Sequence, residues 1–424
     1  MPKTLPAHPA DIVGYSRLAI EAVLGLTDLV ETEHHNISLA PGVFGHPAQG
    51  GTHGITGLVY KGIRGVTKLV GSGISVGLAP LLLMDRDAQS TPEREAALAV
   101  LNGILGEHLA ATANPLAITM HLRRQGLPLV LQSGALSAAV PKITSKLLIL
   151  VHGLCCNDLQ WLRQGHDHGR ALSRDLGYTA VYLHYNTGRH VSHNGREFAA
   201  LLESLVQEWP ITIEELAIVG HSMGGLVARS AYHYGCSANH RWPQYLRKLI
   251  FLGTPHHGTP LERWGNLINV GLELSPYTTA FARLGKIRSA GITDLRYGNL
   301  LDEDWNGSDR FAHRRDSRLP LQLPGEVSCY ALAALKSDRS TTVTDALGDG
   351  VVPVSSALGR HQDRARTLAF PPNHQVVVTG INHFGLLSDA AVHQQIRSWL
   401  AGRERRKLKS CESKKRRLTA AHPK

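Results

Sequence analysis

The stretch from Leu216 to Arg229 reads LAIVGHSMGGLVAR. Its first four residues predict a buried strand, and its last four predict the start of a helix. Between them stands a GxSxG pattern centred on Ser222, where a strained strand-to-helix turn presents a serine hydroxyl above a sheet. Gly220 and Gly224 leave room for the neighbouring strand and helix. The stretch therefore predicts a nucleophile elbow; a glycine-rich helix start with an incidental serine is the alternative.

Short apolar runs alternate with helical patterns on both sides of this stretch. The apolar runs cover residues 147–151, 179–184, 216–219, 248–252, 327–333 and 375–379. The helical patterns cover residues 158–176, 196–209, 223–234 and 389–401. Continuous apolar strands separated by helices are typical of a parallel sheet that is covered on both faces. We therefore expect a doubly wound, mostly parallel α/β sheet.

Three further regions are expected outside that sheet. The long connection between the strands that end at Leu252 and begin at Val327 predicts an inserted cap at about 259–324. Helical patterns at about 11–36, 55–84 and 92–111 predict a mainly helical N-terminal region over 1–140. The catalytic domain is expected over 141–402, followed by a basic and disordered tail over 403–424.

The charge of the chain is concentrated in that tail. The 424 residues carry a formal net charge of +11. Residues 403–424 hold ten Lys or Arg against two Glu, whereas the other 402 residues hold 35 basic against 32 acidic residues. A nearly neutral body makes nucleic acid an unexpected partner. Five cysteines without a CxxC pair, and no signal-like start or membrane-spanning run, favour the cytoplasm.

A serine hydroxyl needs a base, and candidates follow the later strands. His383 lies between the last apolar run and the final helical pattern, so it is the predicted base; a surface-loop histidine is the alternative. His374 and His393 are expected to point elsewhere. Asp349, in the motif GDGVVP, is the predicted acid that orients the base. Asp345 is the competing carboxylate, and a plain turn residue is the other reading of Asp349.

An oxyanion hole needs two backbone N–H groups near the serine. One is expected from Met223, directly after the nucleophile. The other is expected from Leu154, because Gly153 allows close approach at the end of the first strand of the sheet domain. No cofactor or metal is required by this chemistry.

Two histidine-rich stretches have other readings. The stretch GTPHHG, which begins at Gly253, is read as a wall of the cleft because adjacent histidines do not readily share one metal. His166 and His168, which flank Asp167, resemble metal ligands in composition but are read as a solvated or capping cluster. Cys155 and Cys156 are read as small buried residues.

Together these motifs resemble the α/β-hydrolase family, and within it the lipase-like branch of GPI inositol-deacylases and bacterial triacylglycerol lipases. The motifs are LLILVHGL, VGHSMGGLVAR, FLGTPHHGTP, GDGVVP and INHFGLL, which lie within about 145–402. By this resemblance Ser222, Asp349 and His383 map to nucleophile, acid and base. The N-terminal 140 residues match nothing in that pattern.

The predicted function is hydrolysis of small-molecule or lipid carboxylic esters through an acyl-enzyme. An acyltransferase or amidase with the same three residues is an open alternative, and so is a non-catalytic binding protein on a hydrolase fold. The N-terminal helices carry Lys61, Arg64 and Lys68 along one side. This pattern is compatible with a domain packed on the hydrolase or with peripheral contact to an anionic membrane.

Overall fold

The computed structural model describes residues 8–38, 54–83, 90–260, 289–307, 309 and 316–402. Its strands are β1 (His121–Arg124), β2 (Leu127–Pro128), β3 (Lys146–Val151), β4 (Thr179–His184), β5 (Glu215–His221), β6 (Leu246–Leu252), β7 (Ser328–Leu335) and β8 (Gln375–Thr379). Its α-helices are α1 (Pro9–Ser38), α2 (Gly54–Leu83), α3 (Pro92–Ala111), α4 (Ser133–Ala139), α5 (His168–Leu176), α6 (Val191–Glu208), α7 (Met223–Ser237), α10 (Ala290–Asp294), α11 (Thr342–Leu347), α12 (Val354–Ala357) and α13 (Ala390–Leu400).

The eight strands of the described residues form one sheet in the order β2-β1-β4-β3-β5-β6-β7-β8. The six strands from β3 to β8 run parallel, and β1 is antiparallel to both β2 and β4. Because β3 pairs with β4 on one side and β5 on the other, the chain winds outward in both directions from β3. This topology confirms the predicted fold class, a doubly wound and mostly parallel α/β-hydrolase sheet.

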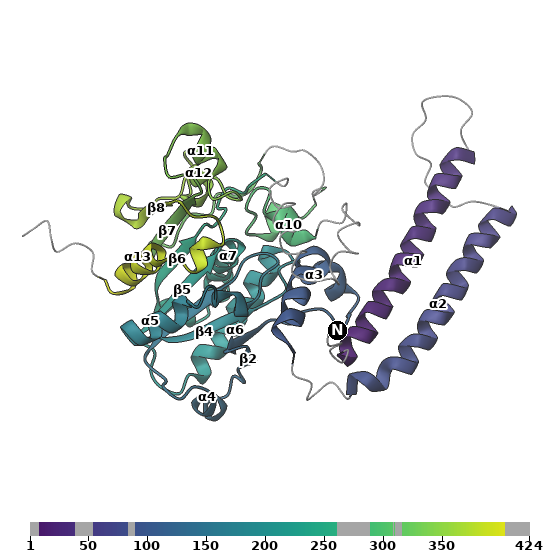
Figure 1. Cartoon of the computed structure of the whole chain (residues 1–424), viewed down its shortest axis with the longest axis horizontal. Helices are drawn as coiled ribbons and strands as arrows, with labels where there is room; N and C mark the ends of the chain where they lie inside the picture. Colours follow the sequence, from purple (N-terminus) through teal and green to yellow (C-terminus); the bar gives the residue numbers. More distant parts are fainter. Residues whose placement is uncertain are drawn as a thin grey trace, which may run out of the picture. The chain divides into compact units, whose positions relative to one another are not determined.

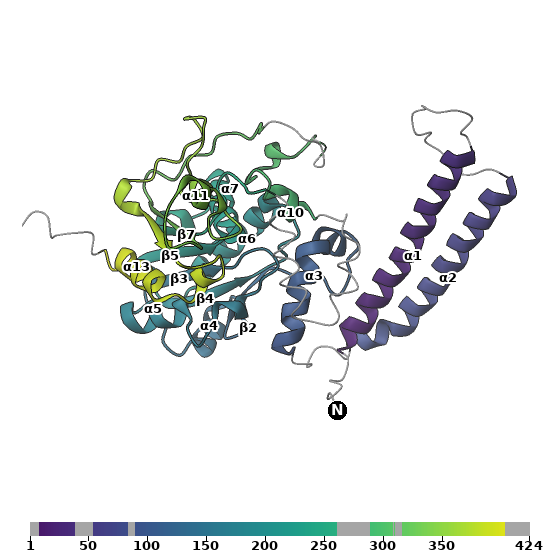
Figure 2. The same ribbon diagram turned by 45° about the horizontal axis from the view of Figure 1, so that its top comes forward.

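Helices cover both faces of the sheet. On one face lie α5 and α13 (Figure 2). Leu172 of α5 and Trp399 of α13 join a buried cluster with alternate strand residues such as Leu150 and Val219. On the other face lies α7, where a Cβ built on Gly225 would come within 2.9 Å of Phe251 Cδ1. Apolar side chains that alternate between two covered faces explain why the strands read as continuous apolar runs.

The antiparallel strands β1 and β2 extend the sheet beyond the predicted strands. The sequence HLRR of β1 has no apolar run, yet Leu122 is fully buried and Arg123 is held by Glu95 and Asp158 at 2.7 and 3.2 Å. A strand of four residues held partly by ion pairs gives no periodic signal in the sequence.

The chain divides into two compact units, residues 1–91 with 109–117 and residues 92–108 with 118–424. In the first unit α1 and α2 lie side by side (Figure 1). They run antiparallel, because Arg64 of α2 pairs with Asp28 while Gly71 lies against Ile20. The domain boundary expected near residue 140 stays a prediction.

Parts of the expected cap and all of the expected tail lie outside the described residues. This applies to residues 261–288, 308 and 310–315 of the cap and to residues 403–424 of the tail. In the described part of the insertion, α10 is anchored to the sheet domain because Asp294 accepts hydrogen bonds from the backbone N–H of Val191 at 2.8 Å and from His190 at 3.0 Å.

Candidate active site

Ser222 lies at the turn from β5 into α7 and has a strained backbone, with φ 56° and ψ −126°. A Cβ on Gly220 would lie 2.6 Å from Gly225 Cα, and one on Gly224 would lie 2.3 Å from the Val151 carbonyl oxygen. Glycine is therefore required on both sides of the turn. The Ser222 N–H donates to the Leu252 carbonyl at 2.8 Å, which fixes the turn to the end of β6.

Asp349 and His383 form a buried hydrogen-bonded pair. Asp349 Oδ2 lies 2.7 Å from His383 Nδ1, and the His383 N–H donates to the Asp349 carbonyl at 3.1 Å. The other carboxylate oxygen accepts from the N–H groups of Val351 and Val352 at 2.9 and 2.8 Å. The carboxylate is thereby fixed, and it selects the ring nitrogen of His383 that carries the proton.

The competing residues are engaged elsewhere. Asp345, in α11, accepts a hydrogen bond from the Ser340 hydroxyl at 2.7 Å. His374 lies 2.9 Å from the carbonyl of Cys329 and stacks on a strand tyrosine. His393 lies in α13 near His168. Of these candidates, the structure places Asp349 beside His383.

His221 contacts the backbone of His383, and the sequence did not identify it as a residue of the candidate site. Its Nε2–H donates to the His383 carbonyl oxygen at 3.1 Å, and the two rings lie 4.7 Å apart. Burial holds the pKa of His221 well below its ordinary value, so the ring is neutral. The signal available in the sequence was only its place before Ser222, which many residue types occupy.

Two glycines bring these groups together at the carboxyl edge of the sheet. A Cβ on Gly253, where φ is +56°, would lie 3.2 Å from Asp349 Oδ2 and 3.3 Å from His383 Cε1. A Cβ on Gly153 would lie 2.9 Å from Ser222 Cβ. The loops after β3, β5 and β6 therefore meet the loops that carry the acid and the histidine.

The two expected oxyanion donors belong to these same loops. Leu154 follows Gly153 directly and Met223 is the first residue of α7; both are buried. The loop before Leu154 is fixed by His152, whose ring stacks on Tyr185 at 4.4 Å while the tyrosine hydroxyl donates to the His152 carbonyl at 2.8 Å. Burial lowers the pKa of His152 to about 3, so this ring adds no positive charge beside the serine.

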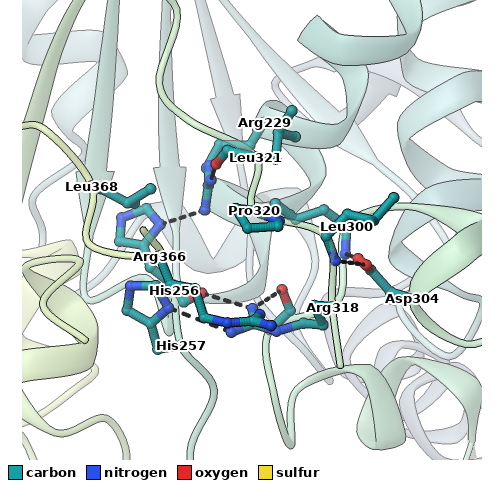
Figure 3. Close-up of a pocket in the computed structure, with 12 residues that line it drawn as sticks. Arg229, His256, His257, Leu300, Asp304, Arg318, Pro320, Leu321, Arg366 and Leu368 are labelled. Atoms are coloured by element: carbon teal, nitrogen blue, oxygen red, sulfur yellow. Dashed lines mark hydrogen bonds between the residues drawn. The ribbon is translucent and has the colours of Figure 1, made fainter. Parts of the chain in front are cut away.

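The GTPHHG stretch has two environments. Gly253 lies against the acid and the histidine, but His256 and His257 line a small cavity with Arg229 and Arg318 (Figure 3). Arg229 Nη1 lies 3.3 Å from His256, and burial lowers the pKa of Arg229 to about 9. Arg318 donates to the carbonyl of His256 at 3.1 Å. These contacts give His256 and His257 a structural role, because they hold the segment after β6 against Arg229 and Arg318.

Cys155 and Cys156, beside the oxyanion loop, are buried free thiols. Burial raises the pKa of both, to about 12 for Cys156. Neither sulfur is a thiolate at neutral pH, which fits the prediction that both are small buried residues.

A family model described as a domain of unknown function (DUF7379) matches residues 131–295. A search of curated proteins finds no match.

Solved structures with a similar fold include Bacillus licheniformis lipase BlEst2 in its propeptide form, at 18% identity and TM-score 0.38, covering 60% of this chain and 51% of the lipase. A Pyrobaculum calidifontis esterase, at 12% identity and TM-score 0.34, covers 61% and 75%. The ester-hydrolase EH1AB1 from the Lake Arreo metagenome, at 15% identity and TM-score 0.35, covers 62% and 76%. The chain thus spans about half the length of the propeptide-form lipase.

Proposed function

We propose that the protein is a serine hydrolase that cleaves carboxylic esters. The observation that carries the proposal is the placement of a strained serine turn and a hydrogen-bonded Asp349–His383 pair at one edge of the sheet, where His221, next to Ser222, bonds to the His383 carbonyl. The same edge holds the two loops that carry Met223 and Leu154. A nucleophile, a base, an orienting acid and two backbone donors are the groups that acyl transfer needs.

In the proposed reaction His383 Nε2 accepts the proton of the Ser222 hydroxyl as its oxygen attacks the ester carbonyl carbon. The N–H groups of Met223 and Leu154 bind the oxygen that becomes negative. Asp349 stabilises the imidazolium that forms. His383 then returns the proton to the departing alcohol oxygen, and water attacks the acyl-enzyme by the same route to release the acid.

The buried setting favours an uncharged acyl group as substrate. Ser222, Asp349 and His383 are 1–2% exposed, and the neutral rings of His152 and His221 flank them. A polyanionic substrate finds no cationic site among these residues. A lipid or small-molecule ester suits this environment, as the resemblance to lipase-like hydrolases also implies.

A fluorophosphonate probe tests the nucleophile. The wild type is expected to be labelled and Ser222→Ala is not. Ser237→Ala, an exposed serine at the end of the same helix, is the matched control and should be labelled normally. Labelling of Ser222→Ala at the wild-type rate would overturn the assignment.

A panel of nitrophenyl esters of increasing chain length then separates lipase-like from small-ester hydrolysis. Addition of an alcohol or amine acceptor to the same assay distinguishes a hydrolase from an acyltransferase. Absence of turnover on every ester, with probe labelling intact, would favour an amidase.

We also propose that α2 contacts an anionic membrane surface. Arg64 and Gly71 face α1, whereas Leu58, Val66 and Leu69 lie on the opposite side at 71%, 63% and 76% exposure. The helix carries three basic and no acidic residues, and Lys61 and Lys68 are exposed. Exposed apolar side chains beside cations are the pattern of an interfacial helix. Among the described residues, no helix combines the length and apolarity needed to cross a bilayer.

Flotation with phosphatidylserine vesicles tests this contact. The wild type should co-float at low salt, and Leu69→Asp should remain in the dense fraction because a charge enters the apolar face. Neutral phosphatidylcholine vesicles are the control for the contribution of Lys61 and Lys68, and binding to them should be weaker. Failure of the wild type to co-float with anionic vesicles at low salt would refute the membrane contact.

A further inference from the structure

Three histidines from two distant parts of the chain meet on the face of the sheet that α5 and α13 cover. His166 precedes α5, His168 is its first residue, and His393 lies in α13. His166 Nε2 lies 2.9 Å from His168 Nδ1, which in turn lies 3.4 Å from His393 Nδ1. His168 is fully buried, so the reading of a solvated cluster is wrong for this residue, although Asp167 does cap α5.

The outer nitrogens of two of these rings have oxygen partners. His168 Nε2 lies 3.0 Å from the carbonyl oxygen of Leu386. A carbonyl only accepts, so Nε2 carries the proton and the lone pair of His168 is on Nδ1. His393 Nε2 lies 3.7 Å from Asp175 Oδ2, which leaves Nδ1 facing His168. Ligating histidines in metal sites carry such carbonyl and carboxylate partners on the far nitrogen.

We propose that His166 Nε2, His168 Nδ1 and His393 Nδ1 bind one zinc ion. One ring nitrogen of each histidine lies within 4.8 Å of a ring nitrogen of the other two. Zinc–nitrogen bonds of about 2.1 Å at tetrahedral angles place ligand nitrogens about 3.4 Å apart. The observed separations of 2.9 and 3.4 Å are close to that value. Three imidazoles leave a fourth position, which water takes on the side of the partly exposed His166.

The three ligands come from two segments that are far apart in the chain, the start of α5 and α13, which gives the ion a positioning role. Leu386, whose carbonyl accepts from His168, belongs to the short helix η6 (Gly385–Leu387), which begins two residues after His383. Its side chain lies 2.7 Å from a Cβ built on Gly253, beside the Asp349–His383 pair. Zinc would therefore tie the loop before α5, the loop of His383 and the C-terminal helix together. It touches no reacting atom.

Titration of the chelator-treated full chain with Zn²⁺ alone tests the site. We expect one tight equivalent per chain, a rise in Tm on loading, and tetrahedral ligand-field absorption when Co²⁺ replaces Zn²⁺. His166→Asn should abolish the Co²⁺ spectrum and weaken zinc binding at least about tenfold. Asp175→Asn should weaken it by about tenfold to a hundredfold.

Controls separate this site from other histidines and from loss of folding. The chain has 24 histidines, so His108→Asn, at an exposed position, is the matched control and should bind zinc as the wild type does. Circular dichroism of metal-free His166→Asn should match that of the metal-free wild type. If the wild type takes up no stoichiometric zinc, or if His166→Asn binds it equally, the cluster is a hydrogen-bonded histidine network without a metal. None of these readouts depends on ester hydrolysis.

Discussion

The Nε2 atom of His221 lies 3.1 Å from the backbone carbonyl oxygen of His383 and donates a hydrogen bond to it. The residue before the proposed nucleophile thus holds the backbone of the proposed base, 162 positions later in the chain. Both groups are buried, so no water replaces this bond if it is lost. The elbow and the loop of His383 are therefore fixed to each other as well as to the sheet.

Loss of this donor should reduce catalysis. In His221→Phe the His383 carbonyl loses this buried donor, at a cost of about 1–3 kcal/mol of folding free energy. Because a small displacement of a catalytic group raises the activation free energy, we expect kcat for ester hydrolysis to fall about a hundredfold. His221→Gln retains a donor and should recover most of kcat. Equal kcat for the Phe variant and the wild type would show that His221 does not position His383.

The acid should be identified by two asparagine variants. Asp349→Asn cannot hold the His383 proton in the same way, and kcat should fall by about 10⁴. Asp345→Asn keeps an oxygen that accepts from Ser340 and should retain wild-type kcat. Steady-state hydrolysis of a nitrophenyl ester measures both. A large loss in Asp345→Asn together with an active Asp349→Asn would reverse the assignment.

The sequence predicted the sheet from β3 onward to within two residues at each strand end, because strands covered on both faces are continuously apolar. The long N-terminal helices were predicted equally well from their periodicity. The strands β1 and β2 were not, because ion pairs of Arg123 and neighbouring strands hold them rather than an apolar run of their own.

For the site, motif position was sufficient to choose Ser222, Asp349 and His383 as candidates, because strand ends of a parallel sheet meet at one edge. The sequence could not show that His168 approaches His393, 225 positions away. It also could not show the bond from His221 to His383. Such pairings depend on how loops and helices cross the sheet, which no local pattern records.

The close approach of the loop after β3 predicts the effect of a single methyl group. In Gly153→Ala the new Cβ would lie 2.9 Å from Ser222 Cβ and 3.3 Å from His221 Nδ1. The loop must move, and the proposed oxyanion donor, the N–H of Leu154, moves with it. Loss of an oxyanion donor lowers kcat by about 10²–10³.

Gly134→Ala is the matched control for this variant. Gly134 lies in α4 and a Cβ there would meet nothing within 4 Å. Replacement of a helical glycine by alanine should raise the free energy of unfolding by about 0.5–1 kcal/mol while leaving kcat unchanged. Unaltered kcat in Gly153→Ala would place the oxyanion donor on another loop.

Acid should destabilise the protein through its buried neutral histidines. Burial lowers the pKa of His152 to about 3 and holds that of His221 and His256 well below the ordinary value. The unfolded chain binds these protons near pH 6.5 whereas the native chain does not, so stability is present above that pH and falls as the pH drops below it. Each such histidine contributes a slope of about 1.4 kcal/mol per pH unit until its native pKa is reached.

Urea unfolding between about pH 7.5 and about pH 5 measures this slope. In His152→Gln, which removes one of the titrating rings, the free energy of unfolding should fall less steeply with acid, by about one proton. His108→Asn, at an exposed position, is the control for the loss of a histidine as such. If His152→Gln and the wild type lose stability in parallel over this range, His152 is protonated in the native protein. The inference that the His152 ring beside Ser222 is neutral would then be wrong.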